Sequence, residues 1–302
     1  MKTNAINRIL IPMDFSNTGL LALEHGAFMA HLFKADLYLL HVIEMLEFSI
    51  SAEGPDVHNR KEIEDEEEKN AKEKLYALAK KIDKKNGIHV IPLIIKGRVI
   101  SAVEKTSKEH KIDIIVMGTH GSKGFEEYFI GSNAHKTVTV SPCPVITVQT
   151  HTQHLGFSNI VMPIDNSFHS RQKANMVIEL ASHYKAKIHI LGLINTNEDI
   201  DENKFNIKID SVEKAVRNAK LSYVKKIVKG KNIAVEAMNY SNEIKADLIV
   251  IMTDHESNLT GMFLGGFAKQ IVNHSQIPVM SIKPLEGNFE AFDLSSSGNP
   301  FG

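Results

Sequence analysis

The chain has 302 residues, of which 43% are hydrophobic and 24% charged, a composition typical of a soluble globular protein with enough apolar material for two cores. Its formal net charge is −1, and no stretch gathers enough Lys and Arg to neutralise a run of phosphates, which excludes duplex nucleic acid as the main partner. The single cysteine, Cys143, excludes an intramolecular disulfide and a multi-cysteine metal site.

Short runs of Ile, Leu and Val alternate with helix-length amphipathic segments in the first half of the chain, as they do when strands are buried on both faces of a parallel sheet. The pattern predicts strands near residues 8–13, 36–43, 88–95, 112–117 and 144–148, and helices near 18–33, 62–86, 99–110 and 132–140. We therefore expect a doubly wound α/β domain with strand order 3-2-1-4-5. In such a domain a ligand binds beyond the carboxyl ends of the first and fourth strands, where the strand order changes direction.

The second half of the chain repeats the first. The segment "NRILIPMDFSN" at residue 7 is matched by "SNIVMPIDNSF" at residue 158, and "KADLYLLHVIE" by "KAKIHILGLIN". We predict two tandem doubly wound domains with parallel five-stranded sheets, over residues 1–150 and 156–285, followed by a poorly ordered tail over 286–302. One element is expected to differ, because "MNYSNEIKADLIV" leaves almost no room for a helix equivalent to that at 99–110.

The segment "MGTHGSKGFEEYFIGSN", residues 117–133, follows the fourth strand and holds glycines at positions 118, 121 and 131. Glycine permits close approach of main-chain amides, and a helix N-terminus adds unpaired donors and a dipole that favours anions. Ser132 and Asn133 can cap the helix that begins there, or the Ser132 hydroxyl can donate to a phosphate oxygen. The loop therefore suits a polyphosphate, although it matches neither the P-loop nor the dinucleotide-binding motif.

Asp14 follows the first strand, so the switch in strand order places it beside the glycine loop. There its carboxylate can accept a hydrogen bond from a ribose hydroxyl. Val42, at the end of the second strand, offers an apolar slot for a base together with Pro12 and Met13. These residues predict a nucleotide site at this edge of the sheet.

The spacing Gly118-x-x-Gly121, followed after nine residues by Gly131-Ser132, resembles the nucleotide signature of ATP-binding universal stress proteins. The segments "PMDFS", "LLHVIE" and "SPCPVITV" are also similar to that family, over residues 4–149 and more weakly over 157–284. The resemblance implies an adenine nucleotide alpha hydrolase-like fold and binding of ATP, or of AMP or ADP, with Mg or Mn held mainly by the phosphates. It further implies that Asp14 contacts the ribose, that Val42 contacts the adenine edge, and that the phosphates are held by Gly118, His120, Gly121, Gly131, Ser132 and Asn133. Pro12, Met13 and Met117 complete the predicted cofactor site.

The second half departs from this pattern. Met252 and His255 stand at the first two glycine positions, where their side chains would crowd a phosphate. We therefore predict one nucleotide site, in the first domain, with the second domain as its structural partner. Asp165, the counterpart of Asp14, is then expected to serve a turn or a helix cap.

The leading hypothesis is a stress-response nucleotide-binding protein that acts as a sensor or regulatory module. The sequence shows no positioned nucleophile and base and no arginine clamp, so no catalytic residue is predicted and any hydrolysis is expected to be slow. One alternative is an ATPase or a phosphoryl or adenylyl transferase, with Asp14 as a metal or base group and His120 assisting. Another is a structural or chaperone-like protein whose glycine loop binds no nucleotide.

No cluster of His, Cys, Asp or Glu has metal-ligand spacing, so no protein metal site is predicted. Because the sequence has no apolar signal core and no apolar span that could cross a bilayer, we expect a cytoplasmic protein without a membrane partner. The final strands of the two domains, near 144–148 and 278–282, would carry open edges. We expect the two domains to pair within the chain, the chain to form a homodimer, and an unidentified protein to be a partner.

Overall fold

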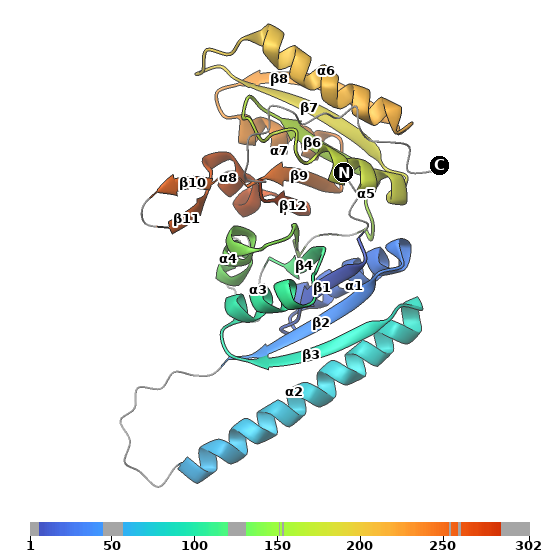
Figure 1. The fold of residues 1–302 in the computed structure, drawn as a ribbon, viewed down its shortest axis with the longest axis vertical. Helices are drawn as coiled ribbons and strands as arrows, with labels where there is room; N and C mark the ends of the chain where they lie inside the picture. The colour runs from blue at the N-terminus through green and yellow to red at the C-terminus, as the bar shows by residue number, and fades with distance from the viewer. Residues whose placement is uncertain are drawn as a thin grey trace.

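Strands and helices alternate along the chain in the computed structural model, which describes residues 6–44, 57–119, 131–150, 152, 154–253, 255–258 and 261–284 (Figure 1). The first half comprises β1 (Arg8–Pro12), α1 (Asn17–Phe33), β2 (Asp36–Ile43), α2 (Val57–Asn86), β3 (Val90–Lys96), α3 (Val99–Glu109), β4 (Ile114–Gly118), α4 (Ser132–Val140) and β5 (Val145–Val148). Each predicted element of this half is present. The largest difference in extent is in α2, which begins five residues before the predicted start at residue 62.

The second half repeats this order with β6 (Asn159–Ile164), α5 (Ala174–Tyr184), β7 (Lys187–Asn195), α6 (Glu202–Asn218), β8 (Tyr223–Gly230), α7 (Ile233–Glu243), β9 (Leu248–Met252), α8 (Gly266–His274) and β12 (Val279–Ile282). Between β9 and α8, two short strands, β10 (His255–Asn258) and β11 (Gly261–Leu264), form an antiparallel hairpin. This hairpin follows the fourth strand of its half, as the glycine segment does in the first half.

The expected shortening of the third crossover in the second half is wrong. Helix α7 has 11 residues, as many as its counterpart α3. It begins directly after Asn232, whose side-chain oxygen accepts hydrogen bonds from the amides of Ala234 and Val235 at 3.1 and 3.3 Å. The apolar stretch "NIAVEAM" therefore belongs to the helix, and the third strand is the lysine-rich β8, whose side chains are mostly exposed.

The strands of both halves lie in one sheet of order β3-β2-β1-β4-β5-β12-β9-β6-β7-β8. Each half has the predicted order 3-2-1-4-5, and pairing within each half is parallel. The two halves meet where β5 pairs antiparallel with β12, with Ile146 opposite Met280. Because these two residues are equivalent in the repeat, the junction has approximate twofold symmetry. The expected pairing of the two domains within the chain is confirmed.

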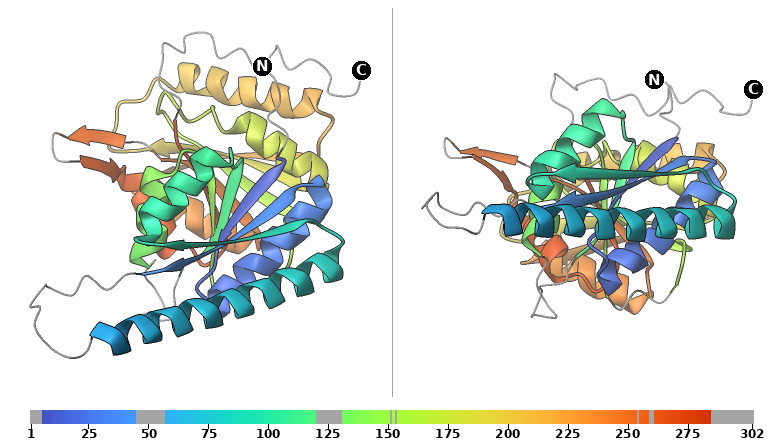
Figure 2. Two further views of the ribbon diagram at one scale, coloured as in Figure 1. Left: turned by 60° about the horizontal axis from the view of Figure 1, so that its bottom comes forward. Right: turned by 90° about the horizontal axis from the view of Figure 1, so that it is seen from below.

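Helices cover both faces of this sheet. α1, α2, α5 and α6 pack on one face over an apolar cluster that runs through both halves. The opposite face carries one cluster under α3 and α4 and another under α7 and α8. Leu264, from β11 of the second half, is buried in the cluster under α3 and α4. Figure 2 shows α2 running alongside β3 at one end of the sheet.

Aromatic residues also join the two halves on the face that carries α1 and α5. Phe157, from the segment between the halves, packs its ring 4.9 Å from that of Tyr184 and 6.2 Å from the imidazole of His25. The preceding residue, Gly156, has φ +87°, and a Cβ there would lie 3.0 Å from the ring of Phe28. Glycine is therefore required at this position by both its conformation and the close approach of Phe28.

Candidate functional site

The turn after β1 holds Asp14 in a fixed and exposed position. The Asp14 carboxylate accepts hydrogen bonds from the amide of Ser16 at 3.0 Å and from its hydroxyl at 2.6 Å. Ser16 is the N-cap of α1, and its hydroxyl oxygen accepts a hydrogen bond from the amide of Gly19 at 3.0 Å. The aspartate, the cap and the first turn of α1 thus form one hydrogen-bonded unit.

The end of β2 holds this turn from the side. The amide of Met13 donates to the carbonyl of Leu40 at 2.7 Å, and Nδ1 of His41 donates to the carbonyl of Met13, also at 2.7 Å. Phe15 adopts φ +60°, and its ring centroid lies 4.9 Å from that of His41. His41 is not among the residues predicted from the sequence. The sequence signal that could have indicated it is the occurrence of a histidine within the otherwise apolar segment "LYLLHVI".

The fourth strand brings Gly118 to the same edge, because β4 pairs directly with β1. A Cβ at Gly118 would lie 2.8 Å from both the carbonyl carbon and the Cβ of Thr18, in the first turn of α1. The absence of a side chain therefore allows α1 to begin against the end of β4. The glycine has a packing reason that the spacing of the loop did not reveal.

The start of helix α4 is held next to the end of β4. The amide of Gly131, just before the helix, donates to the carbonyl of Thr119, just after the strand, at 2.6 Å. Gly131 is the N-cap, and no side chain caps the helix. The expectation that Ser132 or Asn133 acts as the cap is wrong, since Ser132 is already the first helical residue. Both side chains are exposed, and both amides belong to the first turn, where an α-helix supplies no acceptor of its own.

The apolar members of the predicted site lie on both faces of the sheet, because Met13 is buried in the cluster on the face that carries α1 and α2, so the predicted slot of Val42 with Met13 is wrong. Val42 and Met117 pack with the cluster under α3 and α4, where Met117 is buried and Val42 partly buried. Pro12, the last residue of β1, is also partly buried. His120 and Gly121 lie outside the described residues. The structure therefore gathers Asp14, Gly118 and the start of α4 at the edge formed by β1, β2 and β4.

The second half builds a similar turn but holds it differently. Asp165 accepts hydrogen bonds from the amide and hydroxyl of Ser167 at 3.0 and 2.6 Å, as Asp14 does from Ser16. Nζ of Lys208, on α6, donates to the carbonyls of three successive residues, Asp165, Asn166 and Ser167, at 3.3, 2.8 and 3.1 Å. Asp165 thus serves a turn, as expected.

The end of β9 also differs from the end of β4. Met252, buried with 4% exposure, stands at the position of Gly118. The helix that follows β6 begins only at Ala174, whereas the repeat places the equivalent of the α1 start at Phe168. A side chain at the strand end and a fully formed first helical turn would compete for the same space, so the second half keeps the side chain and begins its helix later.

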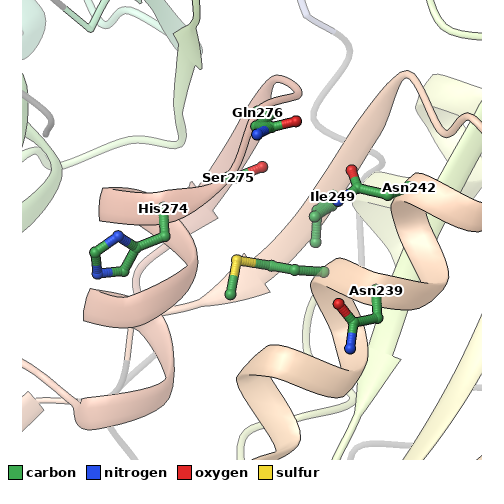
Figure 3. Close-up of a pocket in the computed structure, with 7 residues that line it drawn as sticks. Asn239, Asn242, Ile249, His274, Ser275 and Gln276 are labelled. Carbon is green, nitrogen blue, oxygen red and sulfur yellow. The ribbon is translucent and has the colours of Figure 1, made fainter. Parts of the chain in front are cut away.

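Two cavities within the described residues lie in the second half and contain no predicted site residue. One, of about 170 Å³, lies between α7 and the end of α8, near Asn242 and His274 (Figure 3). The other, of about 320 Å³, lies beside the N-terminus of α7, near Asn195 and Phe267. Among the described residues, no group of three His, Cys, Asp or Glu side chains could hold a metal ion. None of the described helices combines the length and apolarity that a bilayer-crossing segment needs.

The fold and this edge define a tandem doubly wound α/β protein with an acidic turn after the first strand and a glycine at the end of the fourth. The sequence profile of the universal stress protein family matches residues 5–149 and 156–283. The chain therefore belongs to the universal stress protein family, as the glycine spacing and flanking segments indicated.

Relatives of single-domain length match about half of this chain. Two universal stress proteins of Methanocaldococcus jannaschii are each 30% identical, one over 147 residues, with 48% of this chain and 84% of the relative covered, and one over 153 residues, with 47% and 94% covered. A crystal structure of a universal stress protein from Archaeoglobus fulgidus superposes with a TM-score of 0.71 at 18% identity, over 92% of this chain and 98% of that one. At that identity, the likeness shows the tandem fold alone.

Proposed function

We propose that the first domain binds an adenine nucleotide, either ATP or its products AMP and ADP, and that the protein acts as a nucleotide-dependent sensor or regulatory module in a stress response. The observation that carries this proposal is the meeting of three features at one edge of the sheet. These are the Asp14 turn after β1, Gly118 at the end of β4, and the N-terminus of α4. A doubly wound sheet binds its ligands at this switch in strand order.

Each feature would supply a different part of the recognition. The Asp14 carboxylate would accept a hydrogen bond from a ribose hydroxyl, and Val42 and Met117 would give the base an apolar surface. The amides at the start of α4, including those of Ser132 and Asn133, would donate to phosphate oxygens. Magnesium or manganese would be carried mainly by the phosphates.

The comparison between the two halves supports a single site in each chain. In the second half, the Lys208 ammonium group donates hydrogen bonds to the carbonyls of the turn after β6. Met252 stands where the first half has a glycine at the end of the fourth strand. These substitutions remove the open turn and the glycine that the first half offers. We therefore propose that the second domain supports the first and binds no nucleotide.

A binding role also agrees with the hydrogen bonds that Asp14 makes. Its carboxylate accepts two hydrogen bonds from Ser16, which hold it as an acceptor within a turn. Such an acceptor suits recognition of a hydroxyl group. We propose a binding module, with any hydrolysis slow.

Asp14 and Asp165 offer a matched pair of variants for the test, because each accepts the same two hydrogen bonds from a serine two residues later. Titration calorimetry with Mg-ATP should find one site in the protein stripped of nucleotide. Asp14→Ala should weaken binding by about tenfold or more, the effect of losing a hydrogen bond to a charged group. Asp165→Ala, which perturbs an equivalent turn, should leave the affinity unchanged.

Absence of binding to the stripped protein would refute the proposed function. An equal loss in both variants, or two sites per chain, would refute the assignment of the site to the first domain.

A further inference from the structure

Residue Met13, which immediately precedes Asp14, is held by β2 through both of its main-chain polar groups. Its amide donates to the carbonyl of Leu40, and its carbonyl accepts from Nδ1 of His41, each at 2.7 Å. The first contact continues the ladder between neighbouring strands, whereas the second requires a side-chain donor at position 41. Only the protonated Nδ1 can donate to a carbonyl, so the bond also fixes that nitrogen as the one that carries hydrogen.

His41 acts from the face of the sheet opposite the proposed base surface. Leu40 and Val42 belong to the cluster under α3 and α4, and side chains alternate along a strand, so His41 points toward the face that carries α1 and α2. The packing of Phe15 agrees, because this residue lies 4.9 Å from the His41 ring and joins the cluster on that face. His41 therefore contacts the turn that holds Asp14 from the face that carries α1 and α2.

The second half shows what happens to the turn when this histidine is absent. The repeat places Gly192 at the position of His41, and a Cβ there would lie 3.3 Å from the ring of Phe205 and 3.2 Å from Ile209. The space on that face is filled by α6. The same helix supplies Lys208, whose ammonium group binds the carbonyls of the turn. Each half thus fixes its turn with one side chain, but with a different one.

We infer that His41 is a positioning residue for ribose recognition: by its hydrogen bond to Met13, it fixes the turn that directs the Asp14 carboxylate toward a ribose hydroxyl. The inference rests on the proposed nucleotide site in the first domain. His41 acts through Asp14 and touches no part of the nucleotide. Its loss should therefore reduce discrimination at the ribose more than contact with the phosphates.

Two substitutions separate the donor from the rest of the side chain. In His41→Asn, the amide nitrogen is attached to Cγ, as Nδ1 is in histidine, and can still donate to the carbonyl of Met13. In His41→Gln, the amide nitrogen lies one bond further out, where Nε2 stood, and the donor is displaced. His31→Leu is a matched control, because it removes a comparable bond, from Nδ1 to the carbonyl of Asn86 at 2.8 Å, at the distant end of α1.

The readout is the ratio of dissociation constants for 2′-deoxyATP or 3′-deoxyATP over ATP, measured by calorimetry with magnesium. The wild type and His31→Leu should prefer ATP by about tenfold or more over the analogue that lacks the contacted hydroxyl. His41→Asn should retain this preference, whereas His41→Gln should reduce it to about twofold or less. Because the two ligands are compared on the same protein, a loss of folded material would cancel from the ratio.

A full preference in His41→Gln would overturn the inference, as would an equal loss in His41→Asn, since the donor would then not be the cause. ATP binding by the wild type without any ribose preference would also overturn it, while leaving nucleotide binding in place. Failure of the wild type to bind ATP would instead refute the proposed function itself.

Discussion

His25, in α1, is a buried and titratable side chain at the contact between the two halves. Only 4% of its surface is exposed, its ring lies 6.2 Å from that of Phe157, and its Nε2 has no hydrogen-bond partner among the described residues. Burial lowers the pKa of this imidazole from 6.5 to about 4, against a smaller opposing effect of the Glu24 carboxylate. Protonation of His25 should therefore destabilise the folded protein.

The sign and size follow from linkage between protonation and folding. The unfolded chain binds a proton at this residue below pH 6.5, whereas the folded chain does so only below about pH 4. The stabilisation from the neutral ring is therefore complete above pH 6.5 and is lost as the pH falls toward 4. The slope in this window is about 1.4 kcal/mol per pH unit, so lowering the pH from 7 to 5 should cost about 2 kcal/mol of unfolding free energy.

Urea unfolding at pH 7 and at pH 5 measures this cost in the wild type, in His25→Leu and in His31→Leu. The wild type should lose about 2 kcal/mol more than His25→Leu between the two pH values. His31→Leu should behave as the wild type, because it keeps the buried His25. Other groups with shifted pKa values, such as Glu179, whose pKa is raised by burial, are present in all three proteins and cancel in the comparison. An equal loss of stability in the wild type and His25→Leu would refute the reasoning.

Two further predictions concern Gly118 and Cys143. Gly118→Ala should destabilise the protein by about 1–3 kcal/mol in urea unfolding, because the added Cβ would lie 2.8 Å from Thr18. A Cβ added at Gly266, at the start of α8, meets open space, so Gly266→Ala should be neutral or slightly stabilising, and equal effects of the two variants would contradict this explanation. Burial raises the pKa of the Cys143 thiol from 9.0 to about 11. Because only the thiolate reacts, iodoacetamide at pH 8 should alkylate the folded protein about a hundredfold more slowly than the urea-unfolded chain. Similar alkylation rates would contradict this effect of burial.

The architecture could be predicted because its determinants are local and repeated. Runs of Ile, Leu and Val such as β9, in which all five residues are buried, predict strands covered on both faces. The two errors, at α7 and at the cap of α4, arise where local signals conflict. The apolar stretch after Asn232 is compatible with a strand, and a serine next to a glycine is compatible with a cap. In each case the surrounding structure decides between two locally acceptable states.

The arrangement of the candidate site depends on contacts between residues far apart in sequence, which limits what its motifs can predict. The glycine at 118 matches a nucleotide signature, yet it also permits Thr18 to pack against the end of β4. His41 occupies an apolar strand, and only the pairing of β1 with β2 brings it to the carbonyl of Met13. The motif points to the edge of the sheet at which Asp14, Gly118 and the start of α4 meet. It did not distinguish residues that would touch a ligand from residues that hold the turn in place.

The same junction that completes the sheet limits how a homodimer could form. Pairing of β5 with β12 uses the open edges of both halves, so β3 and β8 are the outer strands of the ten-stranded sheet. Two lysines on β8 form ion pairs within the chain on opposite faces of the sheet, Lys225 with Glu213 on α6 and Lys226 with Glu243 on α7. Charged side chains on an edge strand discourage its pairing with another chain. The homodimer stays a prediction, and a surface other than the β5 edge would have to form it. In this chain the second domain already supplies the strand that pairs with β5.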